Sequence, residues 1–319
     1  PEPLTFSIRA LRALAGRAAD FDVVHDNQGL GYGLLGVPRL GLPLVASIHH
    51  PITVDRRIEL ASLGFGDRLS RRRWYGFVTM QARVARRIAG PGPLITVSES
   101  SKRDICRDFG VPPGRVRIIP LGVDTRMFRP RPGARVPGRI VAVASSDSAI
   151  KGVGTLLRAV GKLATERDVH LVVVGKPGQA TERLAGQLSL GDRLRFGHGL
   201  DDEAFSLLLA SAEIAVVPSL YEGFSLPALE HMASGTPLVA SRCGALPEVT
   251  GDAAVLVSPA DSEELAAALR RLHDHAAERA ALARRALRRV GERFAWPAVA
   301  QATAAAYHEA IAARGPRPC

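Results

Sequence analysis

The stretch IAVVPSLYEGFSLPALEHMASG, residues 214–235, contains a strand, a turn and the start of a helix. Its first part, IAVVPS, is apolar and β-branched, which favours a strand buried on both faces. Pro227 disfavours helical backbone in the residue before it and suits the first turn of a helix, so we expect a helix to begin there. A buried strand that runs through a short turn into a helix is the repeating unit of a parallel α/β sheet.

The rest of the chain repeats this alternation of short β-branched runs with longer helical patterns. The strand candidates of the first half are residues 22–26, 43–48, 94–98 and 116–120. Those of the second half are residues 139–144, 170–175, 194–198, 214–219, 237–241 and 253–257. The helical patterns include residues 155–166, 202–212 and 262–275. We therefore predict an α/β protein with two doubly wound, Rossmann-like domains.

A polar segment rich in proline and glycine, RPRPGARVPG at residues 129–138, indicates a domain boundary. We predict an N-terminal domain over residues 1–130, a linker over 131–137, a second domain over 138–292, and a C-terminal helix over 293–319 that packs back on the first domain. Ligands of such sheets bind at the carboxyl ends of the strands, so the expected site is a cleft between the two domains. The first strand follows a helix-like stretch after Pro1, and the first domain offers fewer strands than the second. We expect that domain to be incomplete, with further residues upstream in the native protein.

Composition narrows the class of protein and its compartment. The chain has 319 residues, 46% of them hydrophobic, and no apolar run of about 18 residues, which argues against a transmembrane helix. Its three cysteines, Cys106, Cys243 and Cys319, form no C-x-x-C pair. They argue against a disulfide framework or a zinc site and for a reducing compartment. We expect a cytoplasmic protein.

The net charge of +11 is concentrated in residues 56–117, which hold 14 Lys/Arg against 5 Asp/Glu, a net charge of +9. One interpretation is an anionic partner, above all the acidic lipid headgroups at the inner face of a membrane. The other is an ordinary solvated helix face. Aromatic residues for base stacking are sparse, so we expect no nucleic-acid partner. The pair Trp74-Tyr75, after three arginines, suits either an interfacial anchor or ordinary packing.

The turn at residues 218–230 carries two carboxylates, Glu222 and Glu230, around a helix start. The backbone N–H groups there lack intrahelical partners, which makes an anion site that a diphosphate would fit. A carboxylate beside a phosphate is repelled by its charge unless it binds a group that donates hydrogen bonds. Two neighbouring sugar hydroxyls can both donate to one carboxylate. The turn therefore suits a nucleotide-sugar. The alternative is a helix capped by Ser225, with Glu230 merely near the positive end of the helix dipole.

The motif EGFSLPALE resembles the E-x7-E motif of the family-four retaining glycosyltransferases, which have the GT-B fold of two Rossmann-like domains facing a cleft. Further blocks resemble the same family over residues 21–310. They are LVASIHHP (44–51), IIPLGVDTRMFRP (118–130), IKGVGTLLRAV (150–160) and ASGTPLVASRCGALPEVTGDAAVLVSPAD (233–261). The family also begins with a strand and a glycine-rich loop that this sequence lacks.

The resemblance implies roles for residues that match the motifs. Glu230 would bind the nucleotide ribose and Glu222 the donor sugar, while Lys151 would neutralise phosphate charge as the leaving group departs. His49 would lie near the reaction centre, so the implied catalytic residues are His49, Lys151 and Glu222. The remaining donor-binding residues are Gly175 under the base, then Gly223, Phe224, Ser225 and Leu226 at the diphosphate.

One phosphate-binding arginine of the family pattern is missing, because Ala144-Ser145 stand in its place. Ser145 or Ser146 could donate a weaker hydrogen bond there. At the N-terminal side, Asp26 and Asn27 either cap a loop or touch the acceptor. A metal site at His49-His50 lacks further ligands nearby, and no D-x-D metal motif is found, so we expect no metal and no cofactor.

The expected activity is transfer of a sugar from a UDP-, GDP- or other nucleotide-sugar to an unidentified acceptor, with the anomeric configuration retained. Two alternatives stay open. One is a GT-B nucleotide-sugar epimerase or sugar phosphorylase, although no lysine in a pyridoxal-phosphate context is recognisable. The other is a noncatalytic module that binds a nucleotide-sugar or an anionic surface.

Overall fold

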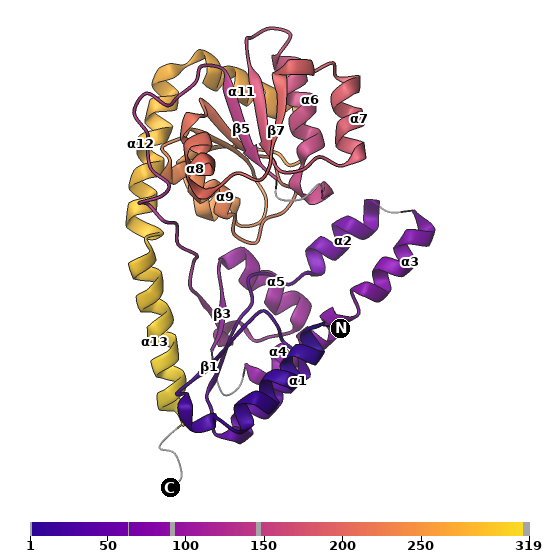
Figure 1. Cartoon of the computed structure of the whole chain (residues 1–319), viewed down its shortest axis with the longest axis vertical. Coiled ribbons are helices and arrows are strands. Elements are labelled where there is room, and N and C mark those ends of the chain that lie inside the picture. The colour runs from indigo at the N-terminus through magenta and orange to yellow at the C-terminus, as the bar shows by residue number, and fades with distance from the viewer. Residues whose placement is uncertain (1, 63, 90–92, 145–147, 315–319) are drawn as a thin grey trace. The chain divides into compact units, whose positions relative to one another are not determined.

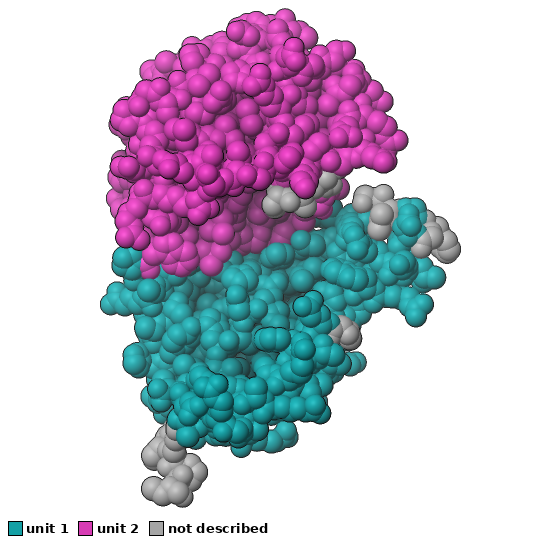
Figure 2. Space-filling view, in the orientation of Figure 1, with its two compact units in different colours: residues 1–120, 297–319 teal, residues 121–296 magenta. Residues whose placement is uncertain are grey.

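The structure is a computed structural model that describes residues 2–62, 64–89, 93–144 and 148–314. The chain forms two compact units (Figure 2). Unit 1 comprises residues 1–120 and 297–319, and unit 2 comprises residues 121–296.

Unit 1 is built on a parallel sheet with the strand order β1-β2-β3-β4. The strands are β1 (Val24–Asn27), β2 (Leu44–Ser47), β3 (Leu94–Thr96) and β4 (Val116–Ile118). The helices are α1 (Glu2–Ala15), α2 (Thr53–Ser62), α3 (Phe65–Trp74), α4 (Phe77–Ile88), α5 (Glu99–Phe109) and α13 (Trp296–Arg314). Short 3-10 turns cover η1 (Ala18–Asp20), η2 (Tyr32–Leu40) and η3 (Pro113–Arg115).

The two faces of this sheet bury different partners, because successive side chains of a strand point to opposite faces. Leu44 and Ala46 of β2 belong to a core that includes residues of η2, α4 and α5. Val45, between them, packs with Val299 and Ala306 of α13. The C-terminal helix α13, yellow in Figure 1, therefore covers one face of the unit 1 sheet.

Unit 2 contains six parallel strands in the order β10-β9-β8-β5-β6-β7. This is the Rossmann order, in which the first strand of the unit lies centrally and the chain winds outward on both sides. The strands are β5 (Arg139–Val143), β6 (His170–Val174), β7 (Leu194–Gly197), β8 (Ile214–Val217), β9 (Leu238–Ser241) and β10 (Ala254–Val257). The helices are α6 (Val153–Leu163), α7 (Gln179–Gln187), α8 (Asp202–Ser211), α9 (Leu226–Ala233), α10 (Leu246–Thr250), α11 (Ser262–Asp274) and α12 (Ala276–Arg293). The 3-10 turns are η4 (Ala149–Lys151) and η5 (Gly191–Arg193).

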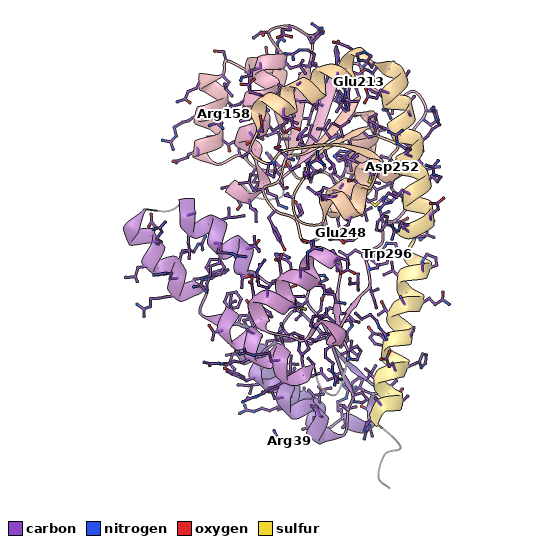
Figure 3. The ribbon with its side chains drawn as sticks, turned by 180° about the vertical axis from the view of Figure 1, so that it is seen from behind. Arg39, Arg158, Glu213, Glu248, Asp252 and Trp296 are labelled. Carbon is purple, nitrogen blue, oxygen red and sulfur yellow. The ribbon has the colours of Figure 1, made fainter. Side chains whose placement is uncertain are left out.

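The amino end of the unit 2 sheet is fixed by a buried ion pair. Glu213, just before β8, lies 2.9 Å from Arg279 of α12 and accepts a hydrogen bond from the N–H of Gly138, also at 2.9 Å (Figure 3). Nearby, the N–H of Val136 donates to the carbonyl of Ser211 at 2.9 Å. Residues 131–137, expected to form a linker, thus lie in unit 2 and pack along this end of the sheet.

Within the described residues, four parallel strands in the first half and six in the second confirm the prediction of a parallel α/β protein. Each observed strand falls within or beside a predicted run. The carboxyl ends of β5, β6, β8 and β9 lead into the loops that hold the candidate site of unit 2.

Candidate active site

The turn between β8 and α9 has the strand–turn–helix form that the sequence predicts. Pro227 lies in the first turn of α9, as expected. Ser225, directly before the helix, has φ 94° and ψ 83°, a left-handed backbone that is strained for a residue with a side chain. Such strain persists only where the surroundings enforce it, and it concentrates at functional sites. The Ser225 hydroxyl also accepts a hydrogen bond from the N–H of Ala228 at 3.4 Å, so the cap considered as the alternative role of this turn is present.

The N–H groups before and at the helix start are available to a ligand. In the ranges that the structure describes, the N–H groups of Phe224, Ser225 and Leu226 donate no hydrogen bond. The Phe224 ring is buried and packs edge-to-face on Phe294, with ring centroids 6.0 Å apart. The buried ring anchors the loop, and the three N–H groups lie at the positive end of the α9 dipole, which makes this turn the candidate anion site.

Lys151 and Glu222 meet in this site. Lys151 Nζ lies 2.9 Å from Glu222 Oε1, and both side chains are largely buried, with 24% and 11% exposed. Ser219 Oγ donates to the same oxygen at 2.8 Å. The η4 turn and the β8–α9 loop thus bring together two of the three residues expected to be catalytic.

Glu230 lies on α9 behind the anion site. Burial of its carboxyl raises its pKa to about 7. Among the residues that the structure describes, its carboxyl has no hydrogen-bond or ion-pair partner, and only its backbone carbonyl accepts, from Ser234. A half-buried acid without a partner is poised to bind a ligand that donates hydrogen bonds.

Gly175 ends β6 at a position that only glycine can occupy. Its φ is +150°, and a Cβ added there would lie 2.0 Å from the carbonyl oxygen of Ala144. The glycine therefore lets the β5 and β6 ends approach each other closely. Ser145 and Ser146, considered as substitutes for the missing arginine, lie outside the described residues.

His49 follows β2 at the carboxyl end of the unit 1 sheet. Its Nε2 donates to Asn27 Oδ1 of β1 at 2.8 Å, and its backbone N–H donates to Gln28 Oε1 at 2.9 Å. Burial, and secondarily His50, lower the pKa of His49, so the ring is neutral at pH 7. Asp26 caps its own loop by accepting from the N–H of Leu30 at 2.9 Å, the first of the two roles considered for it.

A second histidine of unit 1, His25 of β1, makes hydrogen bonds through both ring nitrogens. His25 Nδ1 lies 2.7 Å from the hydroxyl of Tyr307 on α13, and its Nε2 lies 2.8 Å from Ser47 Oγ. Burial, and then His49, lower the pKa of His25. No group of three or more His, Cys, Asp or Glu within the described ranges could hold a metal ion.

Sequence reasoning gave no role to Ser219, Gln28 or Cys243. Cys243 Sγ donates to the carbonyl of Ser219 at 3.1 Å. The signal for Ser219 was its place three residues before Glu222 at the end of a strand, which brings the two side chains together in a tight turn.

Comparison with known proteins decides the family. Residues 1–127 match Glycosyltransferase Family 4, and residues 137–275 match Glycosyl transferases group 1. The chain is 55% identical over 317 residues to an MMP alpha-(1->4)-mannosyltransferase of Mycolicibacterium hassiacum, covering 98% of this chain and 76% of that relative. The chain belongs to glycosyltransferase family 4.

More distant relatives agree with this assignment. The enzyme is 31% identical to a D-inositol 3-phosphate glycosyltransferase of Acidothermus cellulolyticus, over 97% of this chain and 72% of that protein. Its structure resembles sucrose-phosphate synthase of Thermosynechococcus elongatus with a TM-score of 0.80 and 25% identity, over 97% of this chain and 78% of that one. The Anabaena protein HepE, solved in complex with UDP, shares the fold with a TM-score of 0.77 at 20% identity, over 94% and 82% of the two chains. The fold is thus GT-B, and the expected family is confirmed.

The family assignment makes the chain a glycosyltransferase that uses a nucleotide-sugar, as the sequence predicted. It removes the noncatalytic module from consideration. Every helix in the ranges that the structure describes is too short or too polar to cross a lipid bilayer.

Proposed function

We propose that this glycosyltransferase moves a mannosyl group from a nucleotide-diphosphate mannose to a mannose-containing acceptor and keeps the α configuration. The observation that carries the proposal is the 55% identity, over 98% of the chain, to an alpha-(1->4)-mannosyltransferase that acts on methylmannose polysaccharide. Glycosyltransferases of lower identity, at 31%, are named for D-inositol 3-phosphate instead.

In unit 2 the proposed donor site follows from the chemistry of its groups. The free N–H groups of Phe224, Ser225 and Leu226 would bind the diphosphate, with Gly223 allowing close backbone approach. Lys151 would balance the charge that develops on the leaving phosphate, which lowers the barrier electrostatically. These donors need no divalent ion to hold a diphosphate.

The two acids would bind hydroxyl groups at either end of the donor. Glu230, half-buried and without a partner among the described residues, would accept from the ribose diol. Glu222 would accept from hydroxyls of the donor sugar. Gly175 would leave room for the base at the ends of β5 and β6.

In unit 1 we propose that His49 meets the transferred sugar and the acceptor. Its neutral ring is oriented by Asn27, and its backbone N–H is held by Gln28. No side chain is assigned as a nucleophile. The acceptor hydroxyl would attack the face that the phosphate leaves, and the departing phosphate oxygen would take the acceptor proton.

A matrix of donors and acceptors tests this function. GDP-mannose, UDP-glucose and UDP-N-acetylglucosamine are each incubated with an α-(1→4)-linked mannose oligosaccharide and with inositol 3-phosphate. We expect transfer only from the mannose donor to the oligosaccharide, with the product linkage and its α configuration read by NMR. Transfer to inositol 3-phosphate alone, or donor epimerisation without acceptor, would overturn the proposal.

We further propose an anionic lipid surface as a partner of helix α3. Leu69 and Trp74 are 64% and 56% exposed, beside the basic last turn of the helix. Trp74 makes an edge-to-face contact with Tyr75, with ring centroids 4.7 Å apart, and the Arg71 guanidinium lies 5.3 Å from the centroid of the Trp74 ring. An exposed tryptophan amid arginines is typical of interfacial anchors. Tyr75 itself is buried packing, with its hydroxyl donating to Glu59.

A further inference from the structure

Only one oxygen of the Glu222 carboxylate has hydrogen-bond partners among the described residues. Its Oε1 accepts from Lys151 Nζ at 2.9 Å and from Ser219 Oγ at 2.8 Å. Its Oε2 has no partner among the residues that the structure describes. Since each carboxylate oxygen accepts about two hydrogen bonds, Oε1 is filled by the protein and Oε2 is left for a ligand.

Ser219 is a buried residue of the unit 2 fold and does not line the open part of the site. The residue is 2% exposed, and it directly follows Pro218 at the end of β8. Its carbonyl oxygen accepts a hydrogen bond from Cys243 Sγ at 3.1 Å. Cys243 comes just after β9, the neighbouring strand, so this bond joins two strand ends directly beneath Glu222.

Cys243 is a donor and not a reactive thiolate. Burial, and then the Glu222 charge, raise the pKa of its thiol to about 12, so the thiol keeps its proton at neutral pH. The reactive form of cysteine is the thiolate, which this environment suppresses. Cys243 therefore acts here through the hydrogen bond to the Ser219 carbonyl.

The surrounding backbone has little freedom. The N–H of Ala245 donates to the carbonyl of Glu222 at 2.9 Å. A Cβ on Gly244 would lie 2.1 Å from that same carbonyl oxygen, and a Cβ on Gly152 would lie 2.0 Å from the carbonyl oxygen of Pro218. The backbone around Glu222 is therefore closely packed, and the Ser219 hydrogen bond acts on the rotation of the Glu222 side chain.

We propose that Ser219 and Cys243 are positioning residues for the transfer reaction: they fix the Glu222 carboxylate so that Oε1 stays with Lys151 and Oε2 faces the donor sugar. The inference rests on the proposed role of Glu222 at the sugar. A group fixed in advance loses no side-chain freedom when the donor binds, and it holds the sugar in the geometry that the reaction needs. Without Ser219, the long Lys151 side chain is the sole partner of the carboxylate, and a single flexible contact does not define its rotation.

The test compares two ligands that differ only in the sugar. Affinities of Ser219→Ala for GDP and for GDP-mannose are measured by calorimetry, together with kcat and KM for transfer. We expect the affinity for GDP to change less than about threefold and kcat/KM to fall roughly ten- to a hundredfold, the range for a hydrogen bond to a charged group. Ser219→Thr keeps the hydroxyl and should restore most of the activity.

Ser211→Ala is the matched control. Ser211 is also a buried serine of unit 2, with its hydroxyl donating to the Leu208 carbonyl at 2.7 Å, but it lies at the amino end of the sheet. We expect this variant to lose thermal stability without a selective loss for the sugar donor. If Ser219→Ala fails to fold, Ser219→Cys, which keeps the size and weakens the donor, should show the same selective loss to a smaller degree.

Cys243 is tested through its coupling to Ser219. Cys243→Ser keeps a donor and should behave like the wild type, whereas Cys243→Ala should lose part of the discrimination for the sugar donor. Because both residues act through Glu222, the losses in the double variant should be smaller than the product of the single losses.

Two outcomes would overturn the inference. One is an equal loss for GDP and GDP-mannose in Ser219→Ala, and the other is a loss no greater than that of Ser211→Ala. Failure of the proposed function looks different, because the wild type would then bind or transfer another sugar. In that case the affinities of Ser219→Ala and Ser211→Ala are measured for that nucleotide-sugar and for its nucleoside diphosphate. The same two outcomes would then overturn the inference.

Discussion

At the scale of single residues, the proposed role of Glu230 predicts that nucleotide binding depends on pH. Burial raises the pKa of its carboxyl to about 7, so near neutrality about half of the free enzyme carries the proton. The ribose hydroxyls donate hydrogen bonds, and therefore the ionised form is the one that binds. Below pH 7 the proton must first leave, so nucleotide affinity should weaken as pH falls, by roughly tenfold between pH 8 and pH 6.

Calorimetry with a nucleoside diphosphate checks this prediction. Measured at pH 7 in buffers of different ionisation enthalpy, binding should release a fraction of a proton from the wild type. Glu230→Gln removes the titrating carboxyl and should bind more weakly, with only the pH dependence of the ligand's own terminal phosphate, whose pKa is about 6. A wild-type affinity that is flat across this range would contradict the assignment of Glu230 to the ribose.

The two acids of the site should also differ in which ligand they sense. Glu230→Ala should weaken binding of the nucleoside diphosphate itself by about 1.5–3 kcal/mol, the cost of a lost hydrogen bond to a charged group. Glu222→Gln should spare the nucleoside diphosphate and weaken only the intact sugar donor. Equal effects of both substitutions on both ligands would refute the assignment.

His231, next to Glu230 on α9, should make the enzyme sensitive to acid. Its ring is fully buried, and burial lowers its pKa from 6.5 to about 3. Neither ring nitrogen has a partner among the described residues. The folded state resists protonation more than the unfolded state does, so stability is complete above pH 6.5 and is lost as pH falls from 6.5 toward 3.

The size of the effect follows from the pKa difference. At pH 5 the loss attributable to His231 should be about 2 kcal/mol of unfolding free energy. Urea unfolding at pH 7 and pH 5 measures it, with His231→Leu as the variant that lacks the titrating ring. Carboxylates also contribute to the loss of stability in acid. The quantity to compare is therefore the change in unfolding free energy between pH 7 and pH 5, in the wild type minus that in the variant. A zero difference would show that the ring is not buried in its neutral form.

At the scale of helices and strands, the sequence predicts local structure well and side-chain partnerships poorly. The β-branched runs determine the strands, and Pro227 marks the first turn of α9, because these signals act within a few residues. Ser219 and Cys243 are brought together by the pairing of β8 with β9, and Asn27 and His49 by the pairing of β1 with β2. Such contacts depend on strand order and register, which no local pattern contains.

The E-x7-E motif illustrates the same limit within the site. Its spacing places Glu222 in the loop and Glu230 on the helix, as expected. The sequence did not predict the left-handed backbone at Ser225, because positive φ is usual for glycine and rare for serine. It also did not predict that Lys151 and Ser219 share one oxygen of Glu222.

Helix α3 should bind anionic vesicles. Its last turn carries Arg71, Arg72 and Arg73, and its exposed Leu69 and Trp74 offer apolar contact. We expect sedimentation with vesicles containing phosphatidylglycerol and little with neutral ones, and binding that falls steeply with salt. Arg72→Glu combined with Arg73→Glu should abolish it, whereas Arg284→Glu combined with Arg288→Glu on α12 serves as a charge-matched control. Equal binding to neutral and anionic vesicles at low salt would leave only a solvated helix face.

At the scale of the whole molecule, the proposed roles divide between two units. Glu222, Glu230 and Lys151 belong to unit 2, and His49 belongs to unit 1. Each unit has its own sheet and its own buried core. Substitutions in one unit should therefore leave the fold of the other intact, so binding of the free nucleotide and transfer of the sugar are separable measurements.

His49 of unit 1 offers a direct test of whether nucleotide binding and sugar transfer can be separated. We expect His49→Ala to leave the affinity for a nucleoside diphosphate within about twofold and to lower kcat/KM for transfer by roughly tenfold or more, since it removes a polar contact to the reacting sugar. Asn27→Ala should also lower transfer, but by a smaller factor. Asn27 Oδ1 accepts a hydrogen bond from His49 Nε2 at 2.8 Å, and the substitution removes this contact, so the ring is no longer oriented. His50→Ala is the control, since His50 pairs with Asp55 at 3.0 Å and has no proposed role in transfer. If His49→Ala transfers as fast as the wild type, unit 1 contributes to the reaction through other residues.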